Sequence, residues 1–271
     1  MIMSKKAILV VSFGTTYKET REKTIDVLER RIAEEFPGWE VRRAFTSKIV
    51  IKILKKRDGI HVDYITEGLE RMATDGIKDV IVLTTHIING IEYDLITSFV
   101  KERAGEFDSI RVSTPMLTEK KDYEQFVDGL KSTYLKRCAS NDALVMMGHG
   151  TVHYANASYS QLQLELLSRG IFNVFITTVE GFPDFYSSLK LMSGMRFDKV
   201  YVAPLLLVAG DHATNDMAGD EDDSLKSVLE KEGYSTECII QGLGEHEAFQ
   251  DIFIRHLREA MEREPVTKDS H

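Results

Sequence analysis

The sequence predicts an α/β fold of two similar lobes, each a parallel β-sheet flanked by helices. Short apolar segments rich in β-branched residues alternate with longer amphipathic segments along the whole chain, a pattern typical of βαβ units. The chain has 271 residues, enough for two domains of ordinary size. Motifs of the first half also recur, in the same order, in the second half. Together these observations favour two related lobes over a single large sheet.

The first lobe is expected to span residues 1–130. Between its first two strands, residues 18–36 place Ile25, Leu28, Ile32 and Phe36 at near-helical spacing, which predicts an amphipathic helix. Its strands are predicted at four apolar runs, residues 7–13, 39–46, 79–86 and 109–115.

The second lobe is expected to span residues 140–271, after a crossover at residues 131–142. Its strands are predicted at residues 143–149, 171–179, 199–208 and 235–242. Three of its strand ends match strand ends of the first lobe in order. The matching pairs of segments are residues 9–17 with 144–154, 45–49 with 178–182, and 80–96 with 200–217. This alignment pairs Gly14 with Gly150 and Glu92 with His212, and it predicts two similar lobes that face each other across a cleft.

Composition excludes several classes of protein. The chain is 43% hydrophobic and carries a formal net charge of −9, which argues against a nucleic-acid-binding protein. The two cysteines, Cys138 and Cys238, are isolated, so no disulfide scaffold is predicted and a reducing compartment is expected. The apolar run Ala7–Phe13 is too short for a signal peptide, and no run reaches the roughly 20 residues that span a bilayer. We therefore expect a cytoplasmic protein with neither a nucleic acid nor a membrane as partner.

The most informative motif is "LVMMGHGT", residues 144–151, in which His149 stands between Gly148 and Gly150 at the end of an apolar strand. Ligands of open α/β sheets bind at the carboxyl ends of strands. Glu180 and His212 follow the next two strands. Two imidazoles and a carboxylate suit a divalent metal such as cobalt, nickel, iron or zinc, and neutral imidazoles also accept protons.

Each of these residues also has an ordinary structural interpretation. His149 is equally explained as a hydrogen-bonded turn histidine, Glu180 as the cap of the next helix, and His212 as a loop histidine. In the first half the matching places hold Phe13, Thr46 and Glu92, with His86 nearby.

An anion site is predicted where "FGTTYKETREKT" begins a helix, because hydroxyls and free N–H groups gather there. The candidate substrate-binding residues are Ser12, Gly14, Thr15 and Thr16. A local basic patch in this acidic chain offers further cations: Arg43, Lys48, Lys52, Lys55, Lys56 and Arg57. A solvated helix face explains most of the lysines equally well.

Several long segments resemble the anaerobic cobalt chelatases of the sirohydrochlorin type, the CbiK family. The segments are "VVSFGTTY", "RAFTSKIVIKILKKRDGI", "HIINGIEYD", "MGHGT", "VEGFPD" and "PLLLVAGDHATNDMAGDEDDS", and the match runs from about residue 6 to about residue 257. The resemblance implies a chelatase-like fold of two α/β lobes with the active site in the cleft between them. It also implies insertion of Co(II) into sirohydrochlorin or its precorrin-2 form, without ATP, on the oxygen-independent route to cobalamin.

The family's metal ligands fall on His149, Glu180 and His212, its catalytic histidine on His149, and an acidic residue of the same cavity on Glu92. The resemblance implies no prosthetic group, because Co(II) is a substrate. Sirohydrochlorin or precorrin-2 and cobalt are then the expected partners. A non-catalytic tetrapyrrole or metal carrier, a chelatase for nickel or iron, and a homo-oligomer all remain open.

Overall fold

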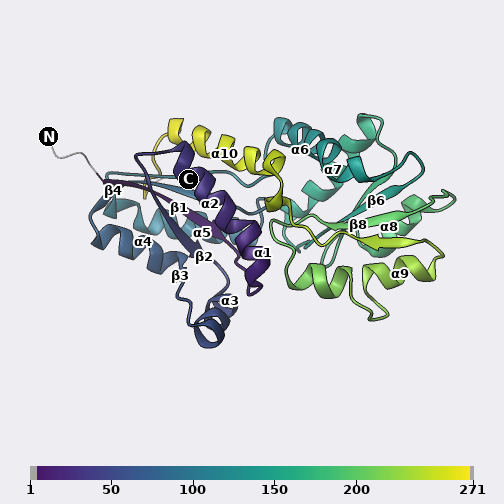
Figure 1. Ribbon diagram of the computed structural model, residues 1–271. Helices are drawn as coiled ribbons and strands as arrows, with labels where there is room; N and C mark the ends of the chain where they lie inside the picture. Colours follow the sequence, from purple (N-terminus) through teal and green to yellow (C-terminus); the bar gives the residue numbers. More distant parts are fainter. Residues whose placement is uncertain (1–4, 269–271) are drawn as a thin grey trace. The chain divides into compact units, whose positions relative to one another are not determined.

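The computed structural model describes residues 5–268, which form two compact units (Figure 1). Unit 1 contains residues 5–116 and 251–268, and unit 2 contains residues 117–250. The sequence-based boundaries, 1–130 and 140–271, differ from this division at both ends. Helix α6 (Lys120–Ser132) belongs to unit 2, whereas most of helix α10 (Glu247–Glu262) belongs to unit 1.

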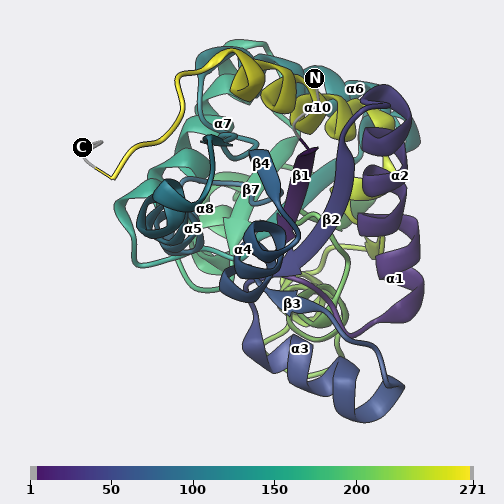
Figure 2. The ribbon, with the colours of Figure 1, turned by 90° about the vertical axis from the view of Figure 1, so that its left-hand side faces the viewer.

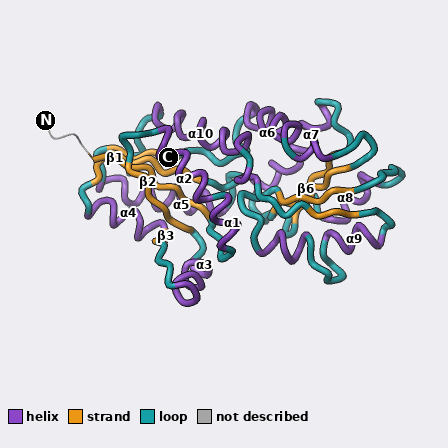
Figure 3. The backbone as a smooth tube through the Cα atoms, in the orientation of Figure 1, coloured by secondary structure: helices purple, strands orange, loops and turns teal. Residues whose placement is uncertain are grey.

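Unit 1 is built on a five-stranded parallel sheet of order β3-β2-β1-β4-β5. Its strands are β1 (Lys5–Ser12), β2 (Glu40–Phe45), β3 (Asp63–Tyr64), β4 (Ile77–Thr84) and β5 (Ser109–Val112). Its helices, besides α10, are α1 (Lys18–Lys23), α2 (Ile25–Glu35), α3 (Lys48–Ile53), α4 (Ile65–Thr74) and α5 (Ile91–Arg103). The tube drawing shows how strands and helices alternate (Figure 3).

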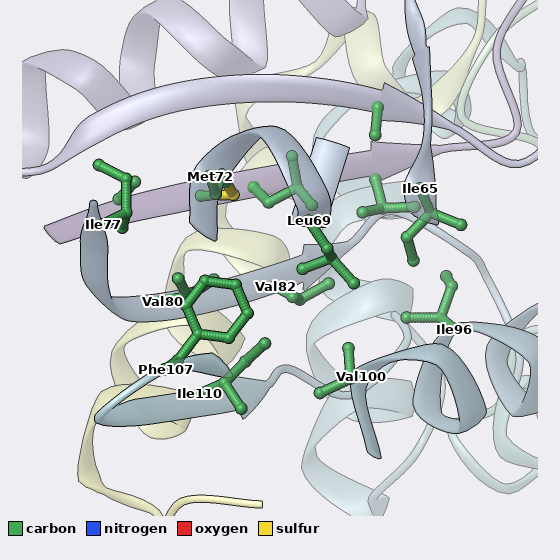
Figure 4. Close-up of a cluster of buried hydrophobic side chains, with 14 of the residues drawn as sticks. Ile65, Leu69, Met72, Ile77, Val80, Val82, Ile96, Val100, Phe107 and Ile110 are labelled. Carbon is green, nitrogen blue, oxygen red and sulfur yellow. The ribbon is translucent and has the colours of Figure 1, made fainter. Parts of the chain in front are cut away.

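Helices cover both faces of this sheet, which explains why its strands read as continuous apolar runs. Helices α4 and α5 lie on one face, and α2 and α10 lie on the other (Figure 2). The first face holds a dense apolar cluster to which Leu69, Met72, Val82, Ile96 and Val100 contribute (Figure 4). The predicted helix over residues 18–36 is present, although it is interrupted at Thr24, where the backbone leaves helical geometry.

Unit 2 is built on a four-stranded parallel sheet of order β7-β6-β8-β9. Its strands are β6 (Ala143–Gly148), β7 (Val174–Thr178), β8 (Val200–Pro204) and β9 (Thr236–Cys238). Its helices, besides α6, are α7 (Ala157–Ser168), α8 (Phe185–Met192), α9 (Leu225–Lys231) and a π-helical turn, η5 (Ala213–Met217). One face of the sheet packs through Val145, Met147 and Val202 against Met192 of α8 and Leu229 of α9.

All eight predicted strands are present, and the four predicted in each lobe share one order, whereas β3 of unit 1 was not predicted. The order β2-β1-β4-β5 in unit 1 corresponds to β7-β6-β8-β9 in unit 2. Gly14 and Gly150, which the sequence alignment pairs, both adopt positive φ angles, of 95° and 81°. The repeat seen in the sequence is therefore a repeat of structure.

Within residues 5–268, no helix has both the length and the apolar character that crossing a membrane requires. Cys138 and Cys238 are both free thiols.

Candidate metal-binding site

The three candidate ligands lie at the carboxyl edge of the unit 2 sheet. His149 directly follows β6, Glu180 lies two residues after β7, and His212 precedes the turn η5 that follows β8. Because β6 is paired with both β7 and β8, the three strand ends are neighbours at that edge. The parallel order of the strands thus brings together residues that are 31 and 32 positions apart in the sequence.

The two glycines around His149 allow two turns to pack closely. A Cβ atom on Gly148 would lie 2.4 Å from the ring of Tyr159, and one on Gly150 would lie 2.6 Å from the backbone nitrogen of Gly181. The backbone N–H of Glu180 donates to the carbonyl of His149 over 2.8 Å. The absence of side chains at both glycine positions therefore allows the His149 turn to pack directly against the Glu180 turn.

The imidazoles of His149 and His212 face each other edge to plane. Their ring centroids are 4.6 Å apart and their planes are inclined at 87°. Both side chains are partly exposed, by 43% for His149 and 35% for His212. Solvent, and therefore a hydrated ion, can reach both rings.

Hydrogen bonds fix the same tautomer on both rings. The Nδ1 of His149 lies 2.9 Å from the carbonyl oxygen of Gly150, and the Nδ1 of His212 lies 2.7 Å from a carboxylate oxygen of Asp216. A carbonyl and a carboxylate only accept, so in each ring Nδ1 carries the proton and donates. Each Nε2 therefore keeps its lone pair for a metal ion or a proton.

Glu180 is the most exposed of the three candidates, at 61%, and its Oε2 lies 3.9 Å from the Nδ1 of His149. It is not the cap of the following helix, because Asp184 caps α8 by accepting from the backbone N–H of Ser187 over 2.7 Å. Among residues 5–268, no three His, Cys, Asp or Glu side chains already surround a point where a metal ion would fit. For Glu180 to join the two imidazoles, its side chain has to rotate toward their Nε2 atoms.

A cavity of about 840 Å³ opens within unit 2, next to the turn η5. Asp216 forms part of its wall, and several other acidic side chains line it, namely Asp184, Asp220, Glu221 and Asp223.

The equivalent edge of unit 1 lacks the ligand set. The backbone bond from Ser47 N–H to the Phe13 carbonyl corresponds to the bond from Glu180 to His149. Phe13 therefore takes the place of His149, as expected, but Ser47 rather than Thr46 takes the place of Glu180. The segment match of residues 45–49 with 178–182 already places Ser47 on Glu180, so naming Thr46 as the match was wrong by one residue.

Glu92 and His86 both lie in unit 1, after β4. Glu92 is in the first turn of α5, and its Oε2 is buried without a hydrogen-bond partner among residues 5–268. Burial and the nearby Glu92 carboxylate raise the pKa of Tyr64. The Nδ1 of His86 lies 2.7 Å from the Thr84 hydroxyl, its Nε2 is buried, and burial lowers the pKa of His86 to about 4.

The predicted anion turn is only partly available for binding. The hydroxyl of Ser12 is buried and accepts a hydrogen bond from Thr85 over 2.9 Å, and Thr15 is buried, with its hydroxyl accepting from the Tyr17 N–H. Gly14 packs on the ring of Phe45. The carbonyl of Thr16 accepts a hydrogen bond from Arg57, which ties this turn to the basic segment 48–58.

The basic patch divides into two parts. Arg43 forms ion pairs with Asp26 and Glu29 and thereby stabilises the fold of unit 1. In the segment 48–58, formed by α3 and the turn after it, the exposed lysines lie beside the exposed side chains of Ile49 and Ile53. These lysines are Lys48, Lys52, Lys55 and Lys56.

Residues 6–262 match the family described as cobalt chelatase (CbiK). The sirohydrochlorin cobaltochelatase of Salmonella typhimurium is 37% identical over 257 residues, which covers 95% of this chain and 97% of that relative. The sirohydrochlorin cobaltochelatase CbiKC of Nitratidesulfovibrio vulgaris is 35% identical over 265 residues, covering 96% of this chain and 92% of the relative.

Solved structures share the fold at low sequence identity. SirB from Bacillus subtilis with Fe³⁺ superposes with a TM-score of 0.66 at 14% identity, covering 97% of this chain and 99% of that one. The sirohydrochlorin chelatase SirB from Bacillus subtilis subspecies spizizenii, in complex with cobalt, superposes with a TM-score of 0.62 at 14% identity, covering 95% of this chain and 96% of that one. The fold of two α/β units is thus a chelatase fold.

Proposed function

The chain belongs to the CbiK family of cobalt chelatases, and from that premise we propose that it is a sirohydrochlorin cobaltochelatase. It inserts Co(II) into sirohydrochlorin, or into the precorrin-2 form, without ATP, on the oxygen-independent route to cobalamin. The observation that carries the chemistry is the pair of neighbouring imidazoles whose Nε2 lone pairs are both open. Insertion exchanges two pyrrole N–H protons for one Co²⁺, so the site needs metal ligands and a proton acceptor.

His149, Glu180 and His212 are the proposed metal ligands. Neutral imidazole nitrogens and a carboxylate oxygen suit first-row divalent ions, and both imidazoles already hold the tautomer that binding requires. The exposed side chain of Glu180 is free to rotate and complete the set. Cobalt enters here as a substrate and leaves in the product.

His149 is also the proposed catalytic base. Its Nδ1 donates to a neutral carbonyl, whereas that of His212 donates to a carboxylate. A carboxylate partner strengthens a ligating imidazole more than a carbonyl does, so His212 is the firmer metal ligand. His149 then exchanges the metal for a pyrrole proton more readily.

Glu92 is the second proposed catalytic residue. A buried carboxylate oxygen without a partner is costly, and a pyrrole N–H of the substrate would supply the missing donor. Its neighbour Tyr64 stays protonated, because burial and the Glu92 carboxylate raise the Tyr64 pKa.

The segment 48–58 is the proposed contact for the carboxylates of the tetrapyrrole. Exposed isoleucines next to exposed lysines fit a flat apolar ring with acidic side groups. The hydrogen bond from Arg57 to Thr16 joins this segment to the predicted turn Ser12–Thr16. Ser12, Gly14 and Thr15 are buried, so the half-buried Thr16 is the member of that turn best able to contribute.

We place the protein in the cytoplasm, since isolated free thiols suit a reducing compartment. Cobalt is the proposed physiological metal, with nickel and iron as the alternatives. Divalent affinities follow a general order that a ligand set cannot reverse, so supply in the cell decides part of the choice.

The test is an anaerobic assay of the purified protein with sirohydrochlorin and Co(II), following the visible spectrum of the tetrapyrrole. We expect turnover by the wild type, none above background by His149→Ala, and normal turnover by His61→Ala, a control at an exposed histidine of unit 1. A protein that binds cobalt and sirohydrochlorin without turnover would be a carrier. Normal turnover by a folded His149→Ala variant would overturn the assignment of His149.

A further inference from the structure

Asp216 lies four residues after His212 on the π-helical turn η5, and its carboxylate oxygen is 2.7 Å from the Nδ1 of His212. Ala213 and Met217, each one position later, are fully buried in the apolar core of unit 2. Because that face of the turn is buried, His212 and Asp216 lie on its partly exposed side. The exposed fractions of their side chains are 35% and 40%. The core therefore sets the distance between the two side chains.

The loop after η5 holds the turn in place. A Cβ atom on Gly219 would lie 2.4 Å from the carbonyl oxygen of Asn215, so this glycine packs directly against the turn. Asn215 also donates from its side chain to Asp211 over 3.0 Å. The fold of unit 2 therefore fixes the position of Asp216, the hydrogen-bond partner of His212.

A neutral histidine can carry its proton on either nitrogen, and the hydrogen-bond partner of one nitrogen decides which. In water the Nε2–H form of a histidine side chain is the more populated one. The carboxylate of Asp216 favours the opposite form, because it can only accept from Nδ1–H. Carboxylate–histidine pairs of this kind fix the orientation of a metal-binding ring and raise its basicity.

We propose that Asp216 is a positioning residue for the metal, a role that rests on the function proposed above. It holds His212 in the Nδ1–H tautomer, with the Nε2 lone pair directed to the incoming Co(II), and touches neither the metal nor the tetrapyrrole. The Gly150 carbonyl holds His149 in the same tautomer, but the carboxylate of Asp216 strengthens His212 as a metal ligand more than a carbonyl does. The two imidazoles therefore bind the metal with unequal strength. His212 captures cobalt, and His149 is the ligand that is more easily released.

The test compares Asp216→Ala and Asp216→Asn with a matched control, Asp223→Asn. Asp223 is an exposed acid in the wall of the same cavity, so its variant loses the same charge without touching His212. The first measurement is the ¹⁵N NMR spectrum of the histidine side chains in metal-free protein at about pH 8, where ordinary imidazoles are neutral. We expect His212 to pass from the Nδ1–H to the Nε2–H tautomer in Asp216→Ala and to keep Nδ1–H in Asp223→Asn.

The second measurement is steady-state insertion at varied cobalt and varied sirohydrochlorin. For Asp216→Ala we expect the KM for cobalt to rise about 10- to 100-fold, with the KM for sirohydrochlorin unchanged. Asp216→Asn should recover part of the loss, because its amide oxygen still accepts from Nδ1–H. Direct titration with Co(II), followed in the visible d–d bands, should show the same order of affinity.

Two results would overturn the proposal. One is an unchanged His212 tautomer in Asp216→Ala. The other is equal defects for cobalt and sirohydrochlorin, which would mean that Asp216 serves the tetrapyrrole or the general stability of the loop. The tautomer of His212 is measured in metal-free protein, so the measurement requires neither bound cobalt nor turnover. If the wild type inserted no cobalt, the proposed function would fail while this measurement still decided the role of Asp216 toward His212.

Discussion

The ring of His149 stands edge-on to the ring of His212, with centroids 4.6 Å apart, and within residues 5–268 neither Nε2 has a hydrogen-bond partner. The same arrangement serves a chelatase twice, since it offers two nitrogen donors to a metal and a proton acceptor once the metal moves on.

Gly150→Ala should disable the site through the backbone. The residue has a φ of +81°, and an added Cβ would meet the backbone of Gly181 at 2.6 Å. We expect a loss of about 1–3 kcal/mol in the free energy of unfolding, measured by denaturant titration, together with a loss of insertion activity. Gly170→Ala is the matched control, because its φ is +72° but nothing lies within 4 Å of the added atom. Equal effects of the two substitutions would show that the contact with Gly181 is unimportant.

Glu92→Gln should lower kcat about 10- to 100-fold while changing the affinity for cobalt by less than about twofold. The physical reason is that the role proposed for Glu92 is to accept a pyrrole proton at its buried Oε2, and an amide cannot take up a proton there. The check is a comparison of kcat with cobalt affinity from direct titration. A variant whose main defect is weaker cobalt binding would identify Glu92 as a metal ligand instead.

Charge reversal in the basic segment should weaken binding of the tetrapyrrole and not of the metal. For Lys52→Glu and Lys55→Glu we expect the KM for sirohydrochlorin to rise up to about fivefold each, the scale of an exposed ion pair. The effect should shrink at high salt, because the charges are exposed. Lys78→Glu is the control, since Lys78 is exposed near the amino end of β4, at the opposite edge of the sheet. An unchanged KM in both variants would remove this segment from the substrate site.

His86 should make the stability of the protein depend on pH. Burial lowers the pKa of His86 to about 4, so the folded protein keeps this imidazole neutral while the unfolded chain takes up a proton below about pH 6.5. The unfolded state then binds more protons between these two values, and stability falls as the pH drops from about 6.5 to about 4. The contribution is at most about 3.5 kcal/mol.

The measurement is denaturant unfolding at several pH values, for the wild type and for His86→Asn. The asparagine variant should lose less stability than the wild type across this window, whatever its stability at neutral pH. Identical slopes in the two proteins would show that His86 is not responsible. The comparison uses slopes because the substitution also changes the contact with the Thr84 hydroxyl.

The sequence alone determined the class of the fold and the position of the candidate ligands along the chain. Continuous apolar runs mark strands that are buried on both faces, and this signal is local, so all eight predicted strands appear in the structure. His149, Glu180 and His212 were found by the same reasoning, because the end of a parallel strand can be read from where its apolar run stops.

Only the tertiary structure decided which polar groups meet at that edge. The sequence gives no sign that Asp216 rather than Asp211 holds His212, because that choice depends on the π-helical turn and on the burial of Ala213 and Met217. Helix α10 likewise ends the chain yet belongs mostly to the first unit. Contacts between distant segments set these pairings, and one residue of register redirects a side chain to the opposite face of a strand.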